Sequence, residues 1–170
     1  MDELDDQQLR ELLPGLRRFA RSLCHDGSSA DDLVQAALER ALSRWHSRRD
    51  QAALKPWLFQ ILYRQFIDEQ RRSRRWQRLA GLFGASLQDS APSAERVHDG
   101  RATLAQFDRL VPEQRALLML VAVEGFSYRE AADALGVPLG TVMSRLSRAR
   151  DRLRVLDEGQ APAPSLRRIP

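Results

Sequence analysis

The sequence predicts an all-α protein made of two small helical domains joined by a flexible linker. Apolar residues recur at the i, i+3, i+4 and i+7 spacing of amphipathic helices in several separate segments. Residues 81–100 lack this periodicity and collect glycine, serine and proline, which is typical of a linker. A capping sequence, a glycine turn and an arginine-rich helix follow in the C-terminal half. We therefore expect domains at residues 1–80 and 101–156, and a flexible tail at residues 157–170.

Two amphipathic helices are expected at the start of the first domain. Residues 7–24 carry apolar side chains at helical spacing, and Pro14 is expected to delay or kink this helix. Ser29 followed by Asp32 resembles a capping box, which predicts that a second helix begins there and runs to about Trp45. The expected buried side of this second helix comprises Leu33, Val34, Ala37, Leu38, Ala41 and Leu42.

A third helix is expected to place Pro56 in its first turn, where proline is well tolerated. Its first half, residues 57–67, is mainly apolar. Its later part carries six arginines and only two acidic residues, Asp68 and Glu69. The arginines are Arg64, Arg71, Arg72, Arg74, Arg75 and Arg78. Such a helix buries its first half and projects positive charge outward from its second half.

The C-terminal half has the pattern of a helix-turn-helix. After Pro112, a helix is expected over residues 113–124, ended by Gly125. Ser127 and Glu130 form a capping box for a short helix, which Gly136 ends by accepting left-handed geometry. Pro138 then presets the first turn of a longer helix, residues 139–156.

The surface of the longer helix predicts duplex DNA binding. Its inner stripe comprises Val142, Leu146, Ala149 and Leu153. Its opposite surface offers Thr141, Ser144, Arg145, Ser147, Arg148 and Arg152. A helix of this kind fits the major groove, where arginine can form two hydrogen bonds with a guanine edge. A solvated basic helix face is the alternative interpretation, and the complete order of cap, turn and arginine-faced helix disfavours it.

Composition excludes several other classes. Cys24 is the only cysteine, so neither an intramolecular disulfide nor a cysteine-rich zinc site can form. The longest apolar run, residues 116–123, is too short to span a bilayer, and the acidic N-terminus is unlike a signal peptide. The three histidines are scattered and no phosphate-binding glycine loop is present, so we expect no enzyme, no metal and no cofactor. These features predict a cytoplasmic protein without a membrane-inserted segment.

The C-terminal half closely resembles region 4 of extracytoplasmic-function (ECF) sigma factors. The resemblance rests on Leu-Val-Pro-Glu-Gln-Arg at 110–115, Gly-Phe-Ser-Tyr-Arg-Glu-Ala-Ala at 125–132, and the run from Gly136 to Arg150. The N-terminal half resembles region 2 of the same family. The matching residues there are Asp-Asp-Leu-Val-Gln at 31–35, Pro-Trp-Leu at 56–58 and the arginine run that follows.

The resemblance implies a subunit of RNA polymerase that recognises two promoter elements and initiates DNA melting. Region 4 would read the −35 element as duplex through Thr141, Ser144, Arg145, Ser147 and Arg148. Region 2 would recognise the −10 element through the loop 46–53 and through Arg64, Gln65, Arg71 and Arg72. Core RNA polymerase would bind Asp32, Gln35 and Glu39. An anti-sigma factor is a further expected partner, because family members are commonly held inactive by one.

This chain departs from the family pattern at several positions, and two alternatives stay open. Ala36 stands where the family often has an acidic residue, Leu38 and Leu42 where aromatic residues are usual, and Gln65 where asparagine is frequent. One alternative is a transcriptional regulator that uses only the helix-turn-helix. The other is a sigma mimic that binds an anti-sigma factor and does not direct transcription.

Overall fold

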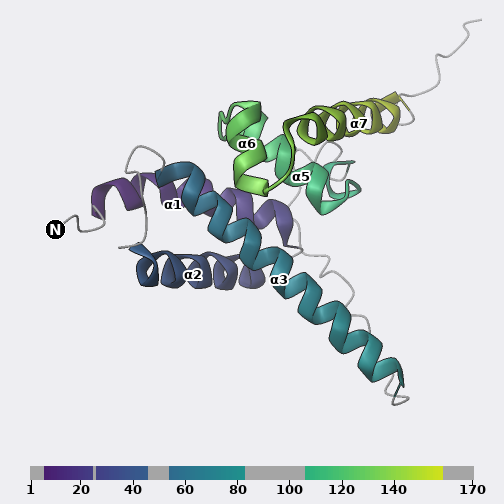
Figure 1. The fold of residues 1–170 in the computed structure, drawn as a ribbon. Helices are drawn as coiled ribbons and strands as arrows, with labels where there is room; N and C mark the ends of the chain where they lie inside the picture. The colour runs from purple at the N-terminus through teal and green to yellow at the C-terminus, as the bar shows by residue number, and fades with distance from the viewer. Residues whose placement is uncertain (1–5, 25, 46–53, 83–105, 159–170) are drawn as a thin grey trace, which may run out of the picture.

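The computed structural model describes residues 6–24, 26–45, 54–82 and 106–158, which form helices and no strand. Three helices come from the first half: α1 (Asp6–Leu23), α2 (Gly27–Ser43) and α3 (Leu54–Leu82). The second half contributes α5 (Pro112–Leu118), the π-helical turn η2 (Met119–Val123), α6 (Tyr128–Leu135) and α7 (Leu139–Glu158). The predicted all-α class is confirmed, and Figure 1 shows the two groups of helices side by side.

The start of α2 differs from the sequence prediction. The Asp26 side chain accepts a hydrogen bond from the backbone N–H of Ser29 at 2.8 Å, and α2 begins at Gly27. The prediction that Ser29 and Asp32 cap this helix was therefore wrong. Asp26 satisfies one of the first unpaired N–H groups, and the Ser29 hydroxyl donates back to its carboxylate at 2.7 Å. Pro14 lies inside α1, which starts eight residues earlier at Asp6, so proline does not delay the helix.

The helix-turn-helix forms as predicted. Ser127 and Glu130 make both hydrogen bonds of the capping box at the start of α6. Gly136 ends α6 at φ +65°, a left-handed conformation that costs glycine nothing. The turn directs α7 across α6, and Val142, Leu146 and Ala149 are fully buried at that crossing. The helix before the motif ends in the π-helical turn η2, and Gly125 follows at φ +72°.

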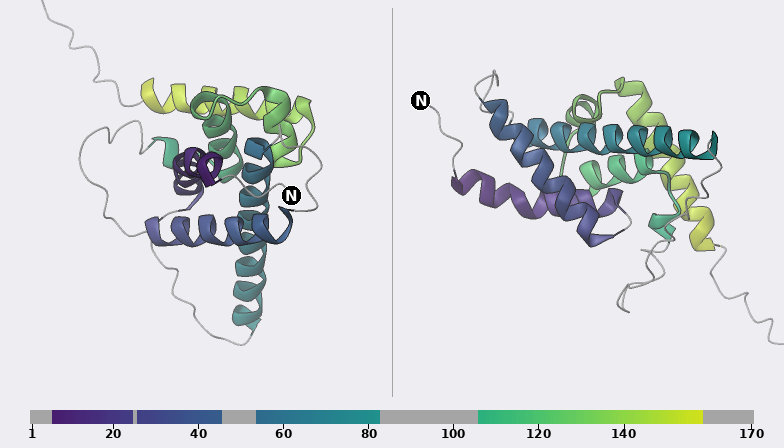
Figure 2. Two further views of the ribbon diagram at one scale, coloured as in Figure 1. Left: turned by 90° about the vertical axis from the view of Figure 1, so that its left-hand side faces the viewer. Right: turned by 90° about the horizontal axis from the view of Figure 1, so that it is seen from below.

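One continuous apolar core joins the two groups of helices. Phe59 of α3 packs between two rings: Phe19 of α1 at 5.3 Å between centroids, and Phe126, which precedes α6, at 5.1 Å. All three side chains are buried, and α6 lies directly against α3. The two views of Figure 2 show the same close approach of α6 to α3. The sequence predicted two domains but not their packing against each other.

Most of the predicted linker lies outside the described residues, and so does most of the predicted tail. Residues 81 and 82 of the expected linker belong to α3, and α7 continues to Glu158. The loop 46–53, predicted to contact the −10 element, also lies outside the described residues. The boundaries expected for the domains therefore remain predictions.

Candidate nucleic-acid interface

The outer face of α7 is the first candidate surface. Opposite its buried stripe, Ser144, Ser147 and Arg148 are exposed, whereas Thr141 and Arg145 are half-buried. The Ser144 hydroxyl donates to the carbonyl of Thr141 at 3.1 Å, so it is bound to the helix backbone in this structure. Arg148 therefore presents the most accessible guanidinium group among the five residues predicted to read duplex DNA.

Arg145 differs from Arg148 in being half-buried. Burial raises the pKa of Tyr63 in α3 to about 12, Glu113 adds to the rise, and the positive charge of Arg145 opposes it. The Arg145 charge is thus close enough to influence a side chain of the other group of helices.

Two apolar residues of α7 were missed by the sequence prediction. Met143 is 55% exposed and Leu139, one turn earlier, is 42% exposed. Met143 borders Ser144 and lies one turn before Ser147, beside the predicted reading surface. The signal that could have found it is its position off the buried stripe, and an apolar side chain there can contact a thymine methyl group.

The second candidate surface is a pocket of about 510 Å³ beside α3, and Arg64 and Arg71 line it. Trp57 supplies an aromatic wall, and Arg40 of α2 and Arg44, the residue that caps the end of α2, add positive charge. We call this the α3 pocket. Its remaining lining residues are Gln60, Ile61, Tyr63, Ile67, Asp68, Leu135 and Gly136. Guanidinium groups beside an aromatic ring are suited to a nucleic-acid strand, because the cations bind phosphates and the ring can stack on a base.

Gln65 has a different environment from the other residues predicted to contact the −10 element. Its side chain accepts a hydrogen bond from Arg40 Nη1 at 3.1 Å and donates to Glu69 Oε1 at 3.2 Å. Gln65 does not line the α3 pocket. In this structure it connects α2 to α3 and positions Arg40, which does line the pocket.

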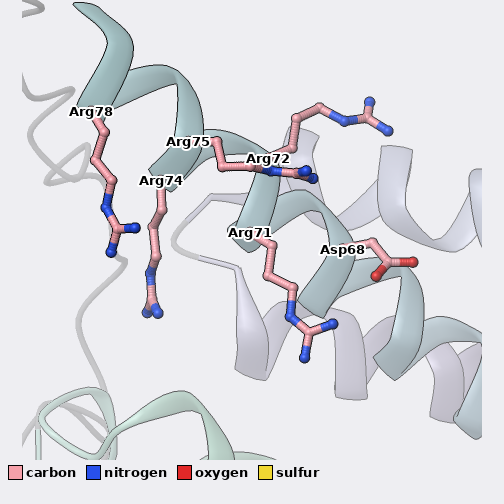
Figure 3. Close-up of a pocket in the computed structure, with 6 residues that line it drawn as sticks. All are labelled: Asp68, Arg71, Arg72, Arg74, Arg75 and Arg78. Atoms are coloured by element: carbon pink, nitrogen blue, oxygen red, sulfur yellow. The ribbon is translucent and has the colours of Figure 1, made fainter. Parts of the chain in front are cut away.

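The second half of α3 extends beyond the other helices as a basic arm (Figure 1). Every residue from 71 to 79 is exposed. In Figure 3, Arg71, Arg74 and Arg78 point to one side of the helix, at spacings that place them on a common face. Arg72 lines the shallow depression along this arm and does not line the α3 pocket. Clustered guanidinium groups of this kind attract phosphates.

A groove between α1 and α2 contains two of the three residues predicted to bind polymerase. Gln35 and Glu39 line the groove and are joined by a hydrogen bond of 3.1 Å, whereas exposed Asp32 lies outside it. The groove also contains Leu13, Arg17, Asp31, Val34, Leu38 and Leu42. The prediction that Leu42 is buried was wrong, because 55% of its surface is exposed. The groove thus combines an apolar floor with acidic groups, a combination suited to a basic amphipathic helix.

No cluster of three or more potential metal ligands occurs among the described residues. Burial raises the pKa of the Cys24 thiol to about 11, with Glu69 and Asp26 adding to the rise, so this thiol is not a reactive thiolate. Within the same described parts of the chain, no helix is both long and apolar enough to cross a membrane.

Each half of the chain matches a known protein family. Residues 9–63 match the family described as the Sigma2 domain of PhyR, and residues 101–153 match Sigma-70, region 4. The ECF RNA polymerase sigma factor EcfG of Rhodopseudomonas palustris is 39% identical over 155 residues, covering 91% of this chain and 85% of the relative. The chain belongs to the ECF sigma factor family.

A second relative and a solved structure agree with this assignment. The ECF sigma factor SigM of Mycobacterium tuberculosis is 35% identical over 151 residues, covering 87% of this chain and 74% of the relative. The sigma factor RpoE of Bartonella quintana, solved in complex with the anti-sigma factor NepR, superposes with a TM-score of 0.72 at 35% identity. That comparison covers 91% of this chain and 96% of RpoE.

The family assignment confirms the function predicted from the sequence. This sigma factor directs core RNA polymerase to specific promoters and initiates DNA melting, and its C-terminal half is a DNA-binding region 4. Its relatives are transcription factors rather than enzymes.

Proposed function

We propose that this sigma factor reads a two-part promoter with two separate surfaces of the chain. The outer face of α7 reads the upstream element as duplex, through Arg148 and Arg145 on base edges and through Thr141, Ser144 and Ser147. The observation that carries the proposal is that the same chain also has the α3 pocket, where Trp57 stands among four arginines. A protein that bound duplex DNA alone would use only the first surface.

The α3 pocket receives a base or phosphate of the downstream element after the strands separate. Arg64 and Arg71 neutralise phosphates, and Trp57 offers a face for stacking. Arg72 lies on the neighbouring surface of the basic arm and extends the phosphate track. Gln65 supports the pocket indirectly. Its amide oxygen accepts a hydrogen bond from Arg40, and its amide nitrogen donates one to Glu69.

Core polymerase binds the groove between α1 and α2. The exposed Leu42 and the half-buried Leu38 supply apolar contact area, and Glu39 and Gln35 supply polar contacts at the rim. Asp32 lies on the same helix, outside the groove, where it can contact a basic partner at its edge. An amphipathic helix with basic residues on its polar side matches this surface in shape and charge.

An anti-sigma factor is the expected regulator of this chain. The similar sigma factor RpoE was solved in complex with the anti-sigma factor NepR. The groove and the exposed apolar residues of α7 give such a protein two places to bind. An affinity pull-down from native cells tests this part of the proposal, and recovery of polymerase without any small regulator counts against it.

Transcription from a promoter library tests the proposal as a whole. The purified protein is combined with bacterial core polymerase and random promoter DNA, and the transcripts are sequenced. We expect transcripts that start downstream of one shared two-part motif. Arg148→Ala relaxes only the upstream part, and Arg64→Ala weakens only the downstream part. A sigma mimic or a duplex-only regulator produces no such transcripts.

A further inference from the structure

The first turns of α7 carry two apolar side chains that do not belong to the core. Leu139 is 42% exposed and Met143, four residues later, is 55% exposed. Residues four apart are neighbours on a helix surface, so the two side chains form one apolar flank. Neither packs against the core in the described parts of the chain, whereas Val142, next to Met143, is fully buried. The flank is therefore open to a partner.

The charge of α7 indicates that this partner is DNA. From residue 139 to residue 156 the helix carries five arginines and one acidic residue, Asp151. A nucleic acid neutralises these charges with its phosphates while its bases contact the apolar flank. The position of Met143 agrees, because it is the fifth residue of α7, and recognition helices contact base edges with their N-terminal residues.

The surface next to Met143 leaves room for a base edge. Gly140 precedes Met143 by three residues and Ser144 by four, so it lies between them on the helix surface. No atom of the described residues stands within 4 Å of a β-carbon built at Gly140. The Ser144 hydroxyl donates to the carbonyl of Thr141 at 3.1 Å, so its hydrogen is directed to the helix backbone. The Met143 side chain is therefore the largest group at this place.

An apolar side chain at this place favours thymine. Thymine is the only base that presents a methyl group in the major groove. The unbranched thioether of methionine adapts its shape to such a group, and it offers no hydrogen-bond donor and only a weak acceptor. Arg148, in contrast, offers the donors that suit a guanine edge. The two side chains are thus suited to different bases.

We propose that Met143 selects a thymine in the upstream promoter element by packing its side chain against the thymine methyl group. The inference rests on the function proposed above for the outer face of α7, and it adds a base that the arginines do not read. Met143 and Arg148 are five residues apart, about 7.5 Å along the helix axis, so they contact separate base pairs. Their contributions can therefore be measured separately.

Removal of single methyl groups from the promoter tests this contact. The promoter is one recovered from the transcription library described above. Each thymine of its upstream element, on either strand, is replaced in turn by deoxyuridine, which lacks only the methyl group and keeps the same base pairing. Each duplex competes with a fluorescein-labelled promoter for the holoenzyme of core polymerase and this protein, and binding is followed by fluorescence anisotropy.

The same duplexes are compared in two variant holoenzymes. Met143→Ala removes the proposed contact, and alanine is well tolerated at an exposed position of a helix. Val155→Ala is the matched control, because Val155 is also an apolar residue of α7 and is 61% exposed, but it lies at the far end of the helix.

We expect one deoxyuridine to weaken binding by the native holoenzyme about four-fold, as for the loss of one buried methyl group. Met143→Ala should bind that duplex and its thymine counterpart equally, and Val155→Ala should behave like the native chain. The proposal is overturned if the upstream element contains no A·T pair, if no replacement weakens binding, or if Met143→Ala shows the native loss.

Arg148→Ala separates failure of this inference from failure of the function on which it rests. If Met143→Ala shows the native loss but Arg148→Ala still relaxes the upstream element, the outer face of α7 reads that element without Met143. A native holoenzyme with no preference for any upstream sequence would instead contradict the function proposed above.

Discussion

Glu124 and Arg18 form an ion pair of 2.9 Å between halves of the chain separated by 106 residues. The carboxylate lies against Gly15, where a β-carbon would stand 2.6 Å from Glu124 Oε2. The close approach explains why α1 has glycine at this position, although glycine weakens the interior of a helix. The pair and the glycine together make the contact between the halves specific.

Gly15→Ala has two opposite effects on stability, one on the helix α1 and one on the contact with Glu124. Alanine favours the helix by roughly 0.5–1 kcal/mol. However, its methyl group collides with the buried Glu124 carboxylate, and overpacking of this kind costs about 1–3 kcal/mol. We expect net destabilisation, seen as a lower midpoint in urea denaturation.

Gly140→Ala is the control for this experiment. Gly140 lies in the first turn of α7, and no atom stands within 4 Å of a β-carbon built there. The alanine should leave stability unchanged or raise it slightly. If both variants shift the midpoint in the same direction by the same amount, the Gly15 contact does not determine stability.

Arg148→Ala should remove discrimination at one base pair of the upstream element. Arg148 is exposed on the outer face of α7, where its guanidinium can form two hydrogen bonds with guanine. We expect a loss of about 1–3 kcal/mol of discrimination at that position, measured by competition between promoter variants.

Arg148→Lys distinguishes base reading from phosphate binding. Lysine keeps the charge but lacks the planar fork that pairs with guanine. It should therefore lose most of the discrimination while retaining much of the overall affinity. Unchanged sequence preference in this variant would assign Arg148 to a phosphate instead.

Leu42→Ala should weaken binding to core polymerase. The leucine is 55% exposed in the groove between α1 and α2, and a partner that covers it gains up to about 1.5–3 kcal/mol. The affinity for core polymerase is measured by fluorescence anisotropy of the labelled sigma factor.

Leu79→Ala is the matched control, because Leu79 is 47% exposed on the distant basic arm and does not line the groove. We expect it to leave polymerase affinity unchanged. An equal loss in both variants would remove the groove as the polymerase site.

Ser127→Ala should change how region 4 responds to acid. Hydrogen bonds from the Ser127 hydroxyl and backbone hold the pKa of Glu130 below its ordinary value of 4.5. Because the folded-state pKa is depressed, the capping contribution is present above the ordinary pKa and is lost as the pH falls through the folded value. Without the hydroxyl, the pKa of Glu130 moves back toward 4.5.

An NMR titration of the Glu130 carboxyl follows this shift directly. Ser144→Ala is the control, because that hydroxyl bonds the backbone of α7 and does not contact Glu130. A Glu130 titration that is identical in the native chain and in Ser127→Ala would show that the capping box does not stabilise the carboxylate.

Local patterns predicted the helix-turn-helix because each of its signals acts within a few residues. The Ser127 cap and the Gly136 turn depend only on neighbouring backbone groups, and both formed as predicted. The start of α2 was harder to predict, because Asp26 and Ser29 are both good capping residues and the turn decides between them. Leu42 was misplaced because helical spacing puts it near the buried stripe, although none of the helices described in the structure covers it.

The contact between the halves could not be predicted from local patterns. Phe59 and Phe126 are ordinary core residues in the sequence, and Glu124 reads as a residue near a helix end. Their proximity depends on how α3 meets α6, a relationship between segments far apart in the sequence. For the same reason, the sequence could not predict that Arg145 is half-buried whereas Arg148 is exposed.

Permanganate reactivity of thymines tests most directly whether this sigma factor recognises and opens promoter DNA. A promoter recovered from the transcription library is mixed with core polymerase, with this protein, or with both. We expect reactive thymines in the downstream element only when both proteins are present, and fewer of them with Arg64→Ala or Arg71→Ala. A duplex that stays unreactive with both proteins, on DNA that the protein binds, would show that this protein does not open promoter DNA.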